Sequence, residues 1–272
     1  MSAIHEIQYW PDRGYVLCGD VSEAAGWLRD MQCKPALCIA DPPYGDILPD
    51  EEWDKADVSA WIEVIKSLQS FDPPPTIYWW GGIGKPNNRP LFEFLLRLEE
   101  ETQYKVRDFI TWKKVRGYGR ATDYLFTREE CLLLTPDGEP PSLFNVMAAR
   151  LEQKRGYPGY NKEYPAKSEY KRRSNVWVET ELLRDKLHPA QKAPIVCKIP
   201  IAVHTRSGEL VLDLYSGSGE TSVQALKLGR PFVAVEKDSE TAHKIAKRLE
   251  AEILQEEREI EAIGEKTYSD NF

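Results

Sequence analysis

The segment Asp41–Tyr44, with the sequence Asp-Pro-Pro-Tyr, joins a carboxylate, two prolines and an aromatic ring. The preceding residues 36–40 are all apolar, which predicts a buried strand that delivers Asp41 at its carboxyl end. Two consecutive prolines cannot donate ladder hydrogen bonds, so the strand must end there in a stiff turn. Such a corner offers hydrogen-bond acceptors and a flat ring, which are the groups that can hold a planar amine.

A second motif, Asp-Leu-Tyr-Ser-Gly-Ser-Gly, occupies residues 213–219 between an apolar run and a predicted helix. Glycines there let a ligand approach the backbone and leave helix N–H groups free. Glu236 ends the next predicted strand, where a carboxylate can accept hydrogen bonds from both hydroxyls of a ribose. The dinucleotide-binding fingerprint requires a third glycine where Ser222 stands, so a nucleoside without a pyrophosphate fits better.

Basic residues gather in two stretches, although the 272-residue chain has a formal net charge of −8. That net charge argues against a protein that coats nucleic acid over its whole surface, but local fields still steer polyanions. Residues 150–173 contain eight basic and three acidic side chains with tyrosines between them. A solvated loop is the alternative for this run. The predicted contacts to nucleic acid are Lys113, Lys114, Arg116, Arg120, Lys154, Arg155, Lys171, Arg172 and Arg173.

Strands and helices alternate along most of the chain and must position these motifs. Strands are predicted at residues 15–18, 36–40, 76–80, 106–112, 130–134, 210–213 and 232–235. Helices are predicted after Ser22, which could cap the first of them, at 61–68, 90–98 and 221–228, and from 239 onward. This alternation predicts a doubly wound α/β sheet with binding loops at the strand carboxyl ends. Trp79 and Trp80 alternate across one strand, so at least one of them belongs to the core.

Composition is that of an ordinary globular protein, with no apolar stretch near the ~20 residues that a membrane span needs. The amino terminus lacks the basic-then-apolar layout of a signal peptide. The five cysteines form no Cys-x-x-Cys pair and the four histidines lie far apart. We therefore expect a cytoplasmic protein with reduced thiols, no metal site and no membrane contact.

The order of the motifs resembles the permuted β class of S-adenosylmethionine-dependent DNA amino-methyltransferases. That family places the Asp-Pro-Pro-Tyr motif first, then a target-recognition insertion, a His-Pro-x-x-Lys segment and the glycine loop. Here the same order runs through Asp41–Tyr44, the basic insertion, His188–Lys192 and Tyr215–Gly219. Residues 111–114, 127–130 and 229–236 are also similar to family motifs. The chain departs from the family pattern at Tyr215, Glu220 and Ala193.

The resemblance implies a circularly permuted, doubly wound and mostly parallel seven-stranded sheet with helices on both faces. It divides the chain into a catalytic half at 1–139, a target-recognition insertion at 140–187 and a cofactor-binding half at 188–272. Helical and strand periodicity fades across the insertion and resumes near Leu210.

The resemblance also implies S-adenosylmethionine as the cofactor. The implied cofactor-binding residues are Asp20, Asp213, Tyr215, Gly217, Gly219, Thr221, Glu236 and Lys192, and the implied catalytic residues are Asp41, Pro42, Pro43 and Tyr44. Simpler interpretations stay open, because Asp20 could merely cap a turn and Lys192 could be structural.

The implied reaction is methylation of adenine N6 in double-stranded DNA. In this hypothesis the Asp41 carboxylate and the Pro42 carbonyl accept the two amine hydrogens, and Tyr44 stacks on a base flipped out of the duplex. A cognate restriction endonuclease is the further partner considered, and the chain is expected to be a monomer or a homodimer.

Four other functions remain open from the sequence. Cytosine N4 is also an exocyclic amine, although related cytosine enzymes often carry Ser in place of the Asp. RNA could replace DNA as the substrate. A catalytically silent nucleic-acid-binding subunit is disfavoured by the intact Asp41 and Glu236. A nucleotide-dependent oxidoreductase is disfavoured by Ser222 and by the Asp-Pro-Pro-Tyr corner.

Overall fold

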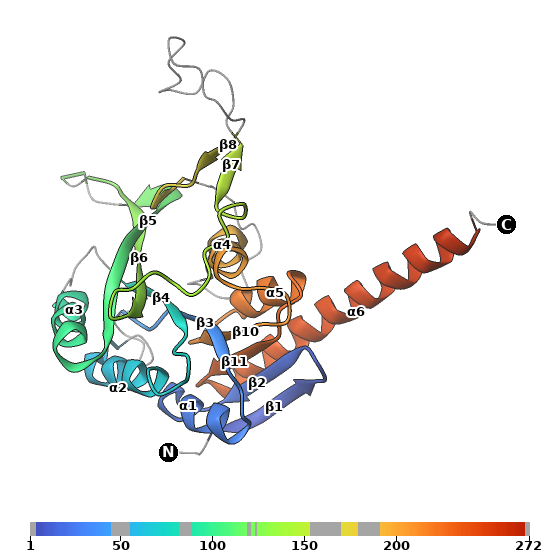
Figure 1. Cartoon of the computed structure of the whole chain (residues 1–272), viewed down its shortest axis with the longest axis horizontal. Helices are drawn as coiled ribbons and strands as arrows, with labels where there is room; N and C mark the ends of the chain where they lie inside the picture. The colour runs from blue at the N-terminus through green and yellow to red at the C-terminus, as the bar shows by residue number, and fades with distance from the viewer. Residues whose placement is uncertain are drawn as a thin grey trace, which may run out of the picture.

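The computed structural model describes residues 4–44, 55–81, 89–118, 121–122, 124–152, 170–178 and 191–269. A nine-stranded sheet in the order β1-β2-β11-β10-β3-β4-β6-β5-β9 forms its centre (Figure 1). Its strands are β1 (His5–Trp10), β2 (Gly14–Cys18), β3 (Pro35–Ala40), β4 (Thr76–Gly81), β5 (Tyr104–Tyr118), β6 (Phe126–Pro136), β9 (Val176–Trp177), β10 (Leu210–Leu214) and β11 (Phe232–Glu236).

The α/β prediction is confirmed, but the described sheet has nine strands where seven were predicted. Strands β2, β11, β10, β3 and β4 are parallel neighbours, whereas β6 runs antiparallel to both β4 and β5. One extra strand is β1, which pairs antiparallel with β2 at one edge. The other is β9, two residues within the predicted insertion that pair with Thr111 and Trp112 of β5.

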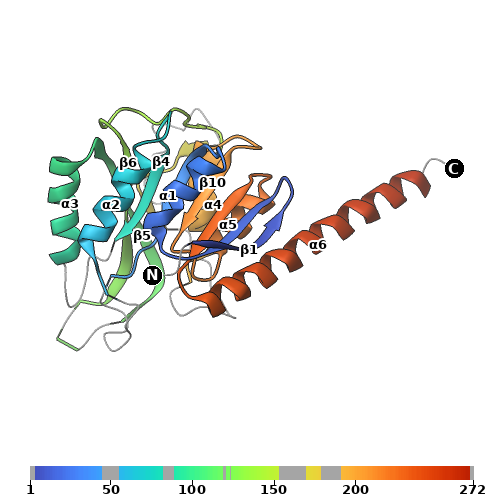
Figure 2. The same ribbon diagram turned by 90° about the horizontal axis from the view of Figure 1, so that it is seen from below.

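Helices cover both faces of the sheet, as Figure 2 shows from below. One face packs against α1 (Val21–Asp30), α2 (Val58–Leu68) and α3 (Arg89–Glu101). The other packs against α4 (Pro194–His204), α5 (Glu220–Lys227) and the first part of α6 (Ser239–Ser269). With both faces covered, Trp79 and Trp80 of β4 are both buried, which confirms a core role for this pair.

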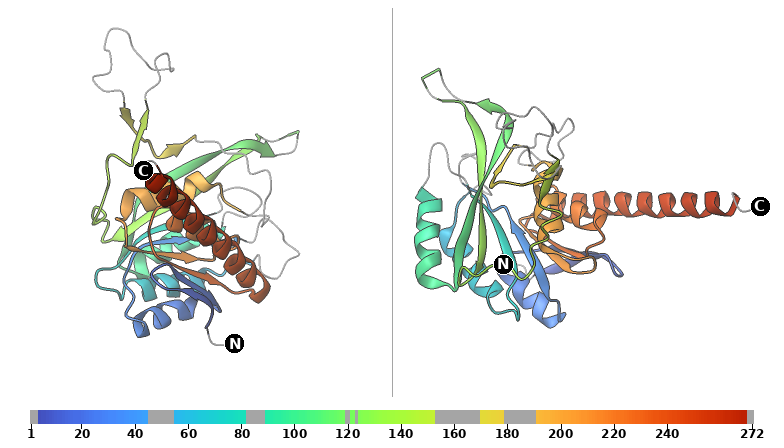
Figure 3. Two further views of the ribbon diagram at one scale, coloured as in Figure 1. Left: turned by 90° about the vertical axis from the view of Figure 1, so that its right-hand side faces the viewer. Right: turned by 45° about the horizontal axis from the view of Figure 1, so that its top comes forward.

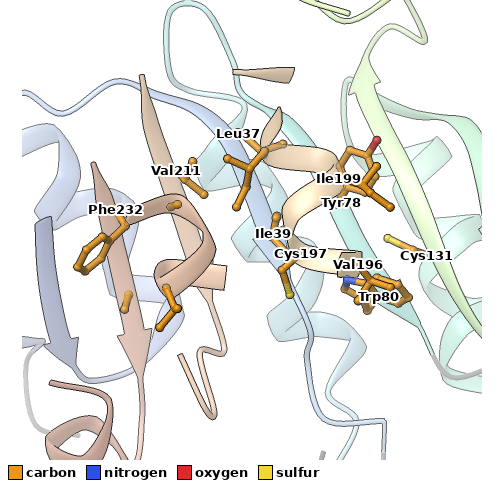
Figure 4. Close-up of a cluster of buried hydrophobic side chains, with 14 of the residues drawn as sticks. Leu37, Ile39, Tyr78, Trp80, Cys131, Val196, Cys197, Ile199, Val211 and Phe232 are labelled. Atoms are coloured by element: carbon orange, nitrogen blue, oxygen red, sulfur yellow. The ribbon is translucent and has the colours of Figure 1, made fainter. Parts of the chain in front are cut away.

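Helix α4 lies inside the stretch where no regular structure was expected before Leu210. Its eleven residues are apolar nearly all round and include Pro200, so they show no one-sided helical pattern. Val196, Cys197 and Ile199 lie against Ile39 and neighbouring strand residues (Figure 4). A helix buried between the sheet and its neighbours has no polar face to reveal it in the sequence.

The cap of α1 also differs from the prediction. The N-cap residue is Asp20, whose Oδ1 accepts hydrogen bonds from the backbone N and the Oγ of Ser22 at 3.0 and 2.8 Å. Ser22 lies inside the first turn instead of capping it. An Asp at this position satisfies an amide that has no partner within the helix.

Two parts project from the body of the protein. The ribbon of β7 (Arg150–Glu152) and β8 (Tyr170–Arg172) is a separate antiparallel pair. Helix α6 packs on the sheet through residues as far as Ile253 and then continues outward (Figure 3). No helix in the described part of the chain is long and apolar enough to cross a membrane.

Candidate active site

The register of the parallel strands brings the predicted site residues together at the edge of the sheet formed by the carboxyl ends of these strands. Leu214 at the end of β10 pairs with Ala40 of β3 on one side and with Val235 of β11 on the other. The next residues in these strands are Tyr215, Asp41 and Glu236. Glu236 in turn pairs with Cys18, two residues before Asp20. The two motifs that the sequence singled out therefore open from adjacent strands.

The Asp41 carboxylate is held through both oxygens. The Tyr44 hydroxyl donates to Oδ1, and the Lys192 Nζ lies 2.6 Å from Oδ2. Pro42 and Tyr44 are buried, whereas Asp41 and Pro43 are partly exposed. Burial, together with the nearby Asp41 and Glu129 charges, raises the pKa of Tyr44 well above its usual value, so its hydroxyl stays protonated and able to donate. The corner thus presents a fixed carboxylate.

Lys192 contributes to this Asp41 corner. Its ammonium also lies 3.0 Å from Glu129 and sits 5.1 Å from the ring centroid of Trp80. Burial opposes its charge, but Asp41 and Glu129 outweigh that cost and raise the Lys192 pKa, which keeps the ammonium charged. These contacts assign it to Asp41, while its cofactor-binding role stays a prediction. His188, Pro189 and Ala190 of the same motif lie outside the described residues.

Glu129 lies in the segment 127–130 that resembles a family motif, but the sequence assigned it no role in this site. It lies in the first half of β6, where it pairs with Trp112 of β5. It also forms an ion pair with Lys114. Burial opposes its charge, but Lys192 and Lys114 lower its pKa. The adjacent acids Glu129 and Glu130 at a strand start were the available signal. Their position at this edge follows only from the antiparallel pairing of β6.

The glycine loop makes a tight turn between β10 and α5. Tyr215, Gly217 and Gly219 have positive φ angles of 58°, 54° and 72°. Gly219 is the N-cap of α5, and a Cβ at this residue would lie 2.8 Å from Cγ2 of Ile245. A glycine is therefore required both for the backbone conformation and for the close approach of α6.

Glu236 joins this loop to the end of β11. Its Oε2 accepts a hydrogen bond from the Gly217 backbone N at 2.9 Å, and its Oε1 accepts one from Asp238 at 3.0 Å. Each carboxylate oxygen has a further lone pair, and the side chain is only partly buried. It can therefore hold the loop and still accept hydroxyl groups of a ligand.

Two predicted cofactor residues lie below the loop surface. Asp213 is buried, and its Oδ2 accepts hydrogen bonds from the backbone N and Oγ of Ser222 at 3.1 and 2.7 Å. Burial raises the pKa of Asp213 to about 7, despite these hydrogen bonds. Thr221 is buried next to Cys197 of α4. Both residues support the loop from beneath, and their ligand contacts stay a prediction.

Asp20 and Tyr215 flank the same edge. In addition to its capping bonds, Asp20 lies 3.5 Å from the Lys237 ammonium. Burial opposes its charge, but Ser22 and Lys237 lower the Asp20 pKa, so it is a carboxylate. The Tyr215 ring packs edge-on against Trp79 at 6.2 Å. The structural role of Asp20 as a cap and its predicted cofactor role are compatible.

Glu220, a position that departs from the family pattern, is a buried structural junction. Its carboxylate lies 2.6 Å from Arg248 of α6 and accepts hydrogen bonds from Gln224 and Gln191 at 2.9 and 3.2 Å. Gln191 directly precedes Lys192. The junction therefore joins the start of α5 to the segment that carries Lys192.

The described residues among the predicted nucleic-acid contacts lie in β5, in β8 and directly after β8. Lys113 and Arg172 are exposed, Lys114 is paired with Glu129, and the Arg173 backbone N donates to the Ala149 carbonyl at 2.9 Å. Arg116 and Lys171 lie in strands whose side chains there are not described, and Arg120, Lys154 and Arg155 lie outside the described residues. Within the described part, no three His, Cys, Asp or Glu side chains group as metal ligands.

A family model described as DNA methylase matches residues 36–248. The type II methyltransferase M2.DpnII of Streptococcus pneumoniae is 26% identical over 244 residues, which cover 79% of this chain and 82% of that protein. The type II methyltransferase M.HpaI of Haemophilus parainfluenzae is 26% identical over 253 residues, covering 87% and 74% of the two chains.

Solved structures share the architecture. The M1.HpyAVI–SAM complex aligns with a TM-score of 0.57 at 22% identity and covers 85% of this chain and 97% of that one. The cytosine-N4-specific PvuII DNA methyltransferase aligns with a TM-score of 0.61 at 13% identity and covers 86% and 85%. Both likenesses concern the fold.

Proposed function

The chain belongs to the DNA methylase family of N6 and N4 amino-methyltransferases, and from this premise we propose that it methylates adenine N6 in double-stranded DNA. One observation carries the proposal: the Leu214–Ala40 pairing sets the Asp41 corner beside the glycine loop. A methyl donor bound at that loop and an amine held at Asp41 would meet at one sheet edge. Asp41, which related cytosine enzymes often replace by Ser, favours adenine.

The residues at the loop fit S-adenosylmethionine, which supplies an electrophilic methyl group when bound. Gly219 leaves no room for a side chain beside Ile245, so the backbone itself forms the floor of the turn. Glu236 retains lone pairs for the ribose hydroxyls while it holds the Gly217 amide. Asp20, Tyr215 and Gly217 complete the proposed cofactor-binding edge.

Asp41 would act by position and charge. An adenine amine is a weak nucleophile because its lone pair is delocalised into the ring. The carboxylate and the Pro42 carbonyl accept hydrogen bonds from its two N–H groups. These hydrogen bonds orient the nitrogen and lower the cost of positive charge on it. Tyr44 and Lys192 hold the carboxylate in one orientation before the base arrives.

The base must leave the duplex to reach this corner. We propose that Lys113 and the β7–β8 ribbon contact the DNA around it, because a two-stranded ribbon fits the major groove and exposed cations bind phosphates. A cognate restriction endonuclease is the proposed functional partner, since two relatives are type II methyltransferases.

The test is methyl transfer from radiolabelled S-adenosylmethionine to unmethylated, PCR-amplified genomic DNA, followed by identification of the modified base. N6-methyladenine is the expected product. Formation of N4-methylcytosine would show instead that the enzyme methylates the exocyclic amine of cytosine. Absence of transfer to any DNA, with cofactor binding intact, would favour the silent subunit and contradict the proposal.

A further inference from the structure

Four charged side chains of alternating sign form a row that runs outward from the catalytic corner. Asp41 pairs with Lys192, Lys192 with Glu129, and Glu129 with Lys114. Lys192 is the most buried, with 9% of its side chain exposed, and Lys114 is the most open at 29%. The outermost cation can therefore reach a solution partner more readily than Lys192 can.

The strands fix the order of this row. Glu129 of β6 lies opposite Trp112 of β5, and Lys114 follows two residues later on the same face. The Trp80 and Trp112 rings pack edge to face at 6.3 Å beneath the cations, with Lys192 5.1 Å and Lys114 6.0 Å from their centroids. This aromatic floor lowers the local dielectric, so the Coulombic attraction within each ion pair is stronger than it would be on an open surface.

Glu129 is the shared partner of two cations. While Lys114 is paired with it, part of its charge is neutralised, and Lys192 is held mainly by Asp41, at 2.6 Å against 3.0 Å for Glu129. A DNA phosphate that binds Lys114 would break the ion pair between Lys114 and Glu129. Glu129 would then have Lys192 as its remaining cation in this row. The ammonium would then move toward Glu129, which frees Asp41 Oδ2 to accept a hydrogen from an amine.

We propose that Glu129 and Lys114 are positioning residues that couple phosphate binding at Lys114 to the release of Asp41 from Lys192. This inference rests on the proposed function, because it takes Asp41 as the acceptor of the target amine and Lys114 as a phosphate contact. Neither residue touches the reacting atoms. Both act through the position of the Lys192 ammonium.

The two positions give opposite kinetic signatures. With Glu129→Gln, nothing competes with Asp41 for Lys192, so the single-turnover rate on PCR-amplified genomic DNA should fall about tenfold or more. The half-saturating DNA concentration should change less than twofold. With Lys114→Met, Glu129 draws Lys192 permanently, so the rate should be kept or raised while the half-saturating DNA concentration rises severalfold.

A double variant tests whether both residues act along one path. Glu129→Gln with Lys114→Met should show the low rate of the first change and the weak DNA binding of the second. Glu101→Gln is the matched control, because Glu101 also bridges two cations, Lys66 and Arg97, far from this row. It should leave rate and DNA affinity unchanged. Glu129→Asp should recover much of the rate.

Equal loss of rate in Glu129→Gln and Lys114→Met, or a wild-type rate in Glu129→Gln, would overturn the inference. Isothermal titration with S-adenosylmethionine checks that each variant is folded. If Glu129→Gln does not fold, the Lys114→Met and Glu129→Asp pair still decides, because a lowered rate in Lys114→Met contradicts the coupling. A wild-type enzyme without methyl transfer would instead contradict the proposed function.

Discussion

Lys192 Nζ lies 2.6 Å from Asp41 Oδ2, although 151 positions separate the two residues in the sequence. One follows the central strand β3 and the other precedes α4, so the contact joins two segments that are far apart in the chain. Both side chains are largely shielded from solvent, because Lys192 is 9% and Asp41 23% exposed. The Asp41 corner is therefore completed by a residue from the second half of the chain.

Replacing Glu236 tests the cofactor site. A carboxylate that accepts ribose hydroxyls contributes about 1.5–3 kcal/mol, so Glu236→Gln should weaken S-adenosylmethionine binding roughly 10–100-fold. Isothermal titration measures this directly. Glu240→Gln is the control, because Glu240 is exposed and forms an ion pair with Lys244 on the surface of α6. An unchanged affinity in Glu236→Gln would remove that residue from the cofactor site.

Alanine substitutions at two glycines distinguish the cost of backbone strain from the cost of close packing. Gly219 and Gly208 both have positive φ, at 72° and 81°, but only Gly219 would place a Cβ against Ile245, whereas nothing lies within 4 Å of a Cβ at Gly208. Alanine should cost about 1–2 kcal/mol at either position through its left-handed backbone. Gly219→Ala should lower the melting temperature further and weaken cofactor binding. Equal melting temperatures and intact binding would contradict a packed loop.

His204 should make stability fall in acid. Its Nδ1 lies 2.7 Å from the Leu143 carbonyl and its Nε2 3.0 Å from the Tyr78 hydroxyl, and burial lowers its pKa to about 4. The unfolded chain binds this proton near pH 6.5. The contribution is thus complete above pH 6.5 and is lost as pH falls toward 4, by up to about 3 kcal/mol.

The measurement is urea unfolding of wild type and His204→Gln at pH 7 and pH 5. Asp213 has the opposite effect on stability, because its pKa of about 7 lies above the value in the unfolded chain. Protonation of Asp213 therefore stabilises the fold as pH falls. The informative quantity is therefore the difference between the two proteins. A difference that does not change with pH would show that His204 binds its proton equally well when folded.

Lys113 tests whether the exposed end of β5 contacts DNA. Its side chain is exposed near the end of the strand at which the site lies. If it contacts a phosphate, Lys113→Ala should weaken DNA binding at all sequences and reduce the slope of log K against log salt by about 0.9. Lys105→Ala, at the other end of β5, is the control. An unchanged slope would remove Lys113 from the interface.

The sheet could be predicted because its strands are short apolar runs that end in acids, glycines or prolines. Residues 36–40 and 210–213 are buried on both faces and need no alternation to be recognised. Helix α4 could not be recognised, since a helix that is apolar nearly all round has no amphipathic period. Strands β1 and β9 are edge strands whose pairing depends on neighbours distant in sequence.

Site residues that directly follow or end an apolar strand could be predicted from the sequence. Site residues whose position depends on the pairing of distant strands could not. Asp41 and Glu236 each follow a recognisable apolar run, and the parallel register brings them together. Glu129 reaches the same edge only because β6 is antiparallel to β4. Lys192 lies outside any predicted element, so nothing local placed its ammonium beside Asp41.

The most direct test is methyl transfer by wild type and Asp41→Ala on unmethylated, PCR-amplified genomic DNA, with S-adenosylmethionine affinity measured in parallel. We predict that wild type forms N6-methyladenine, and that Asp41→Ala binds the cofactor within a fewfold of wild type but forms no methylated base. Full methyl transfer by Asp41→Ala would contradict the account, because the Asp41 carboxylate would then not be the group that holds the amine.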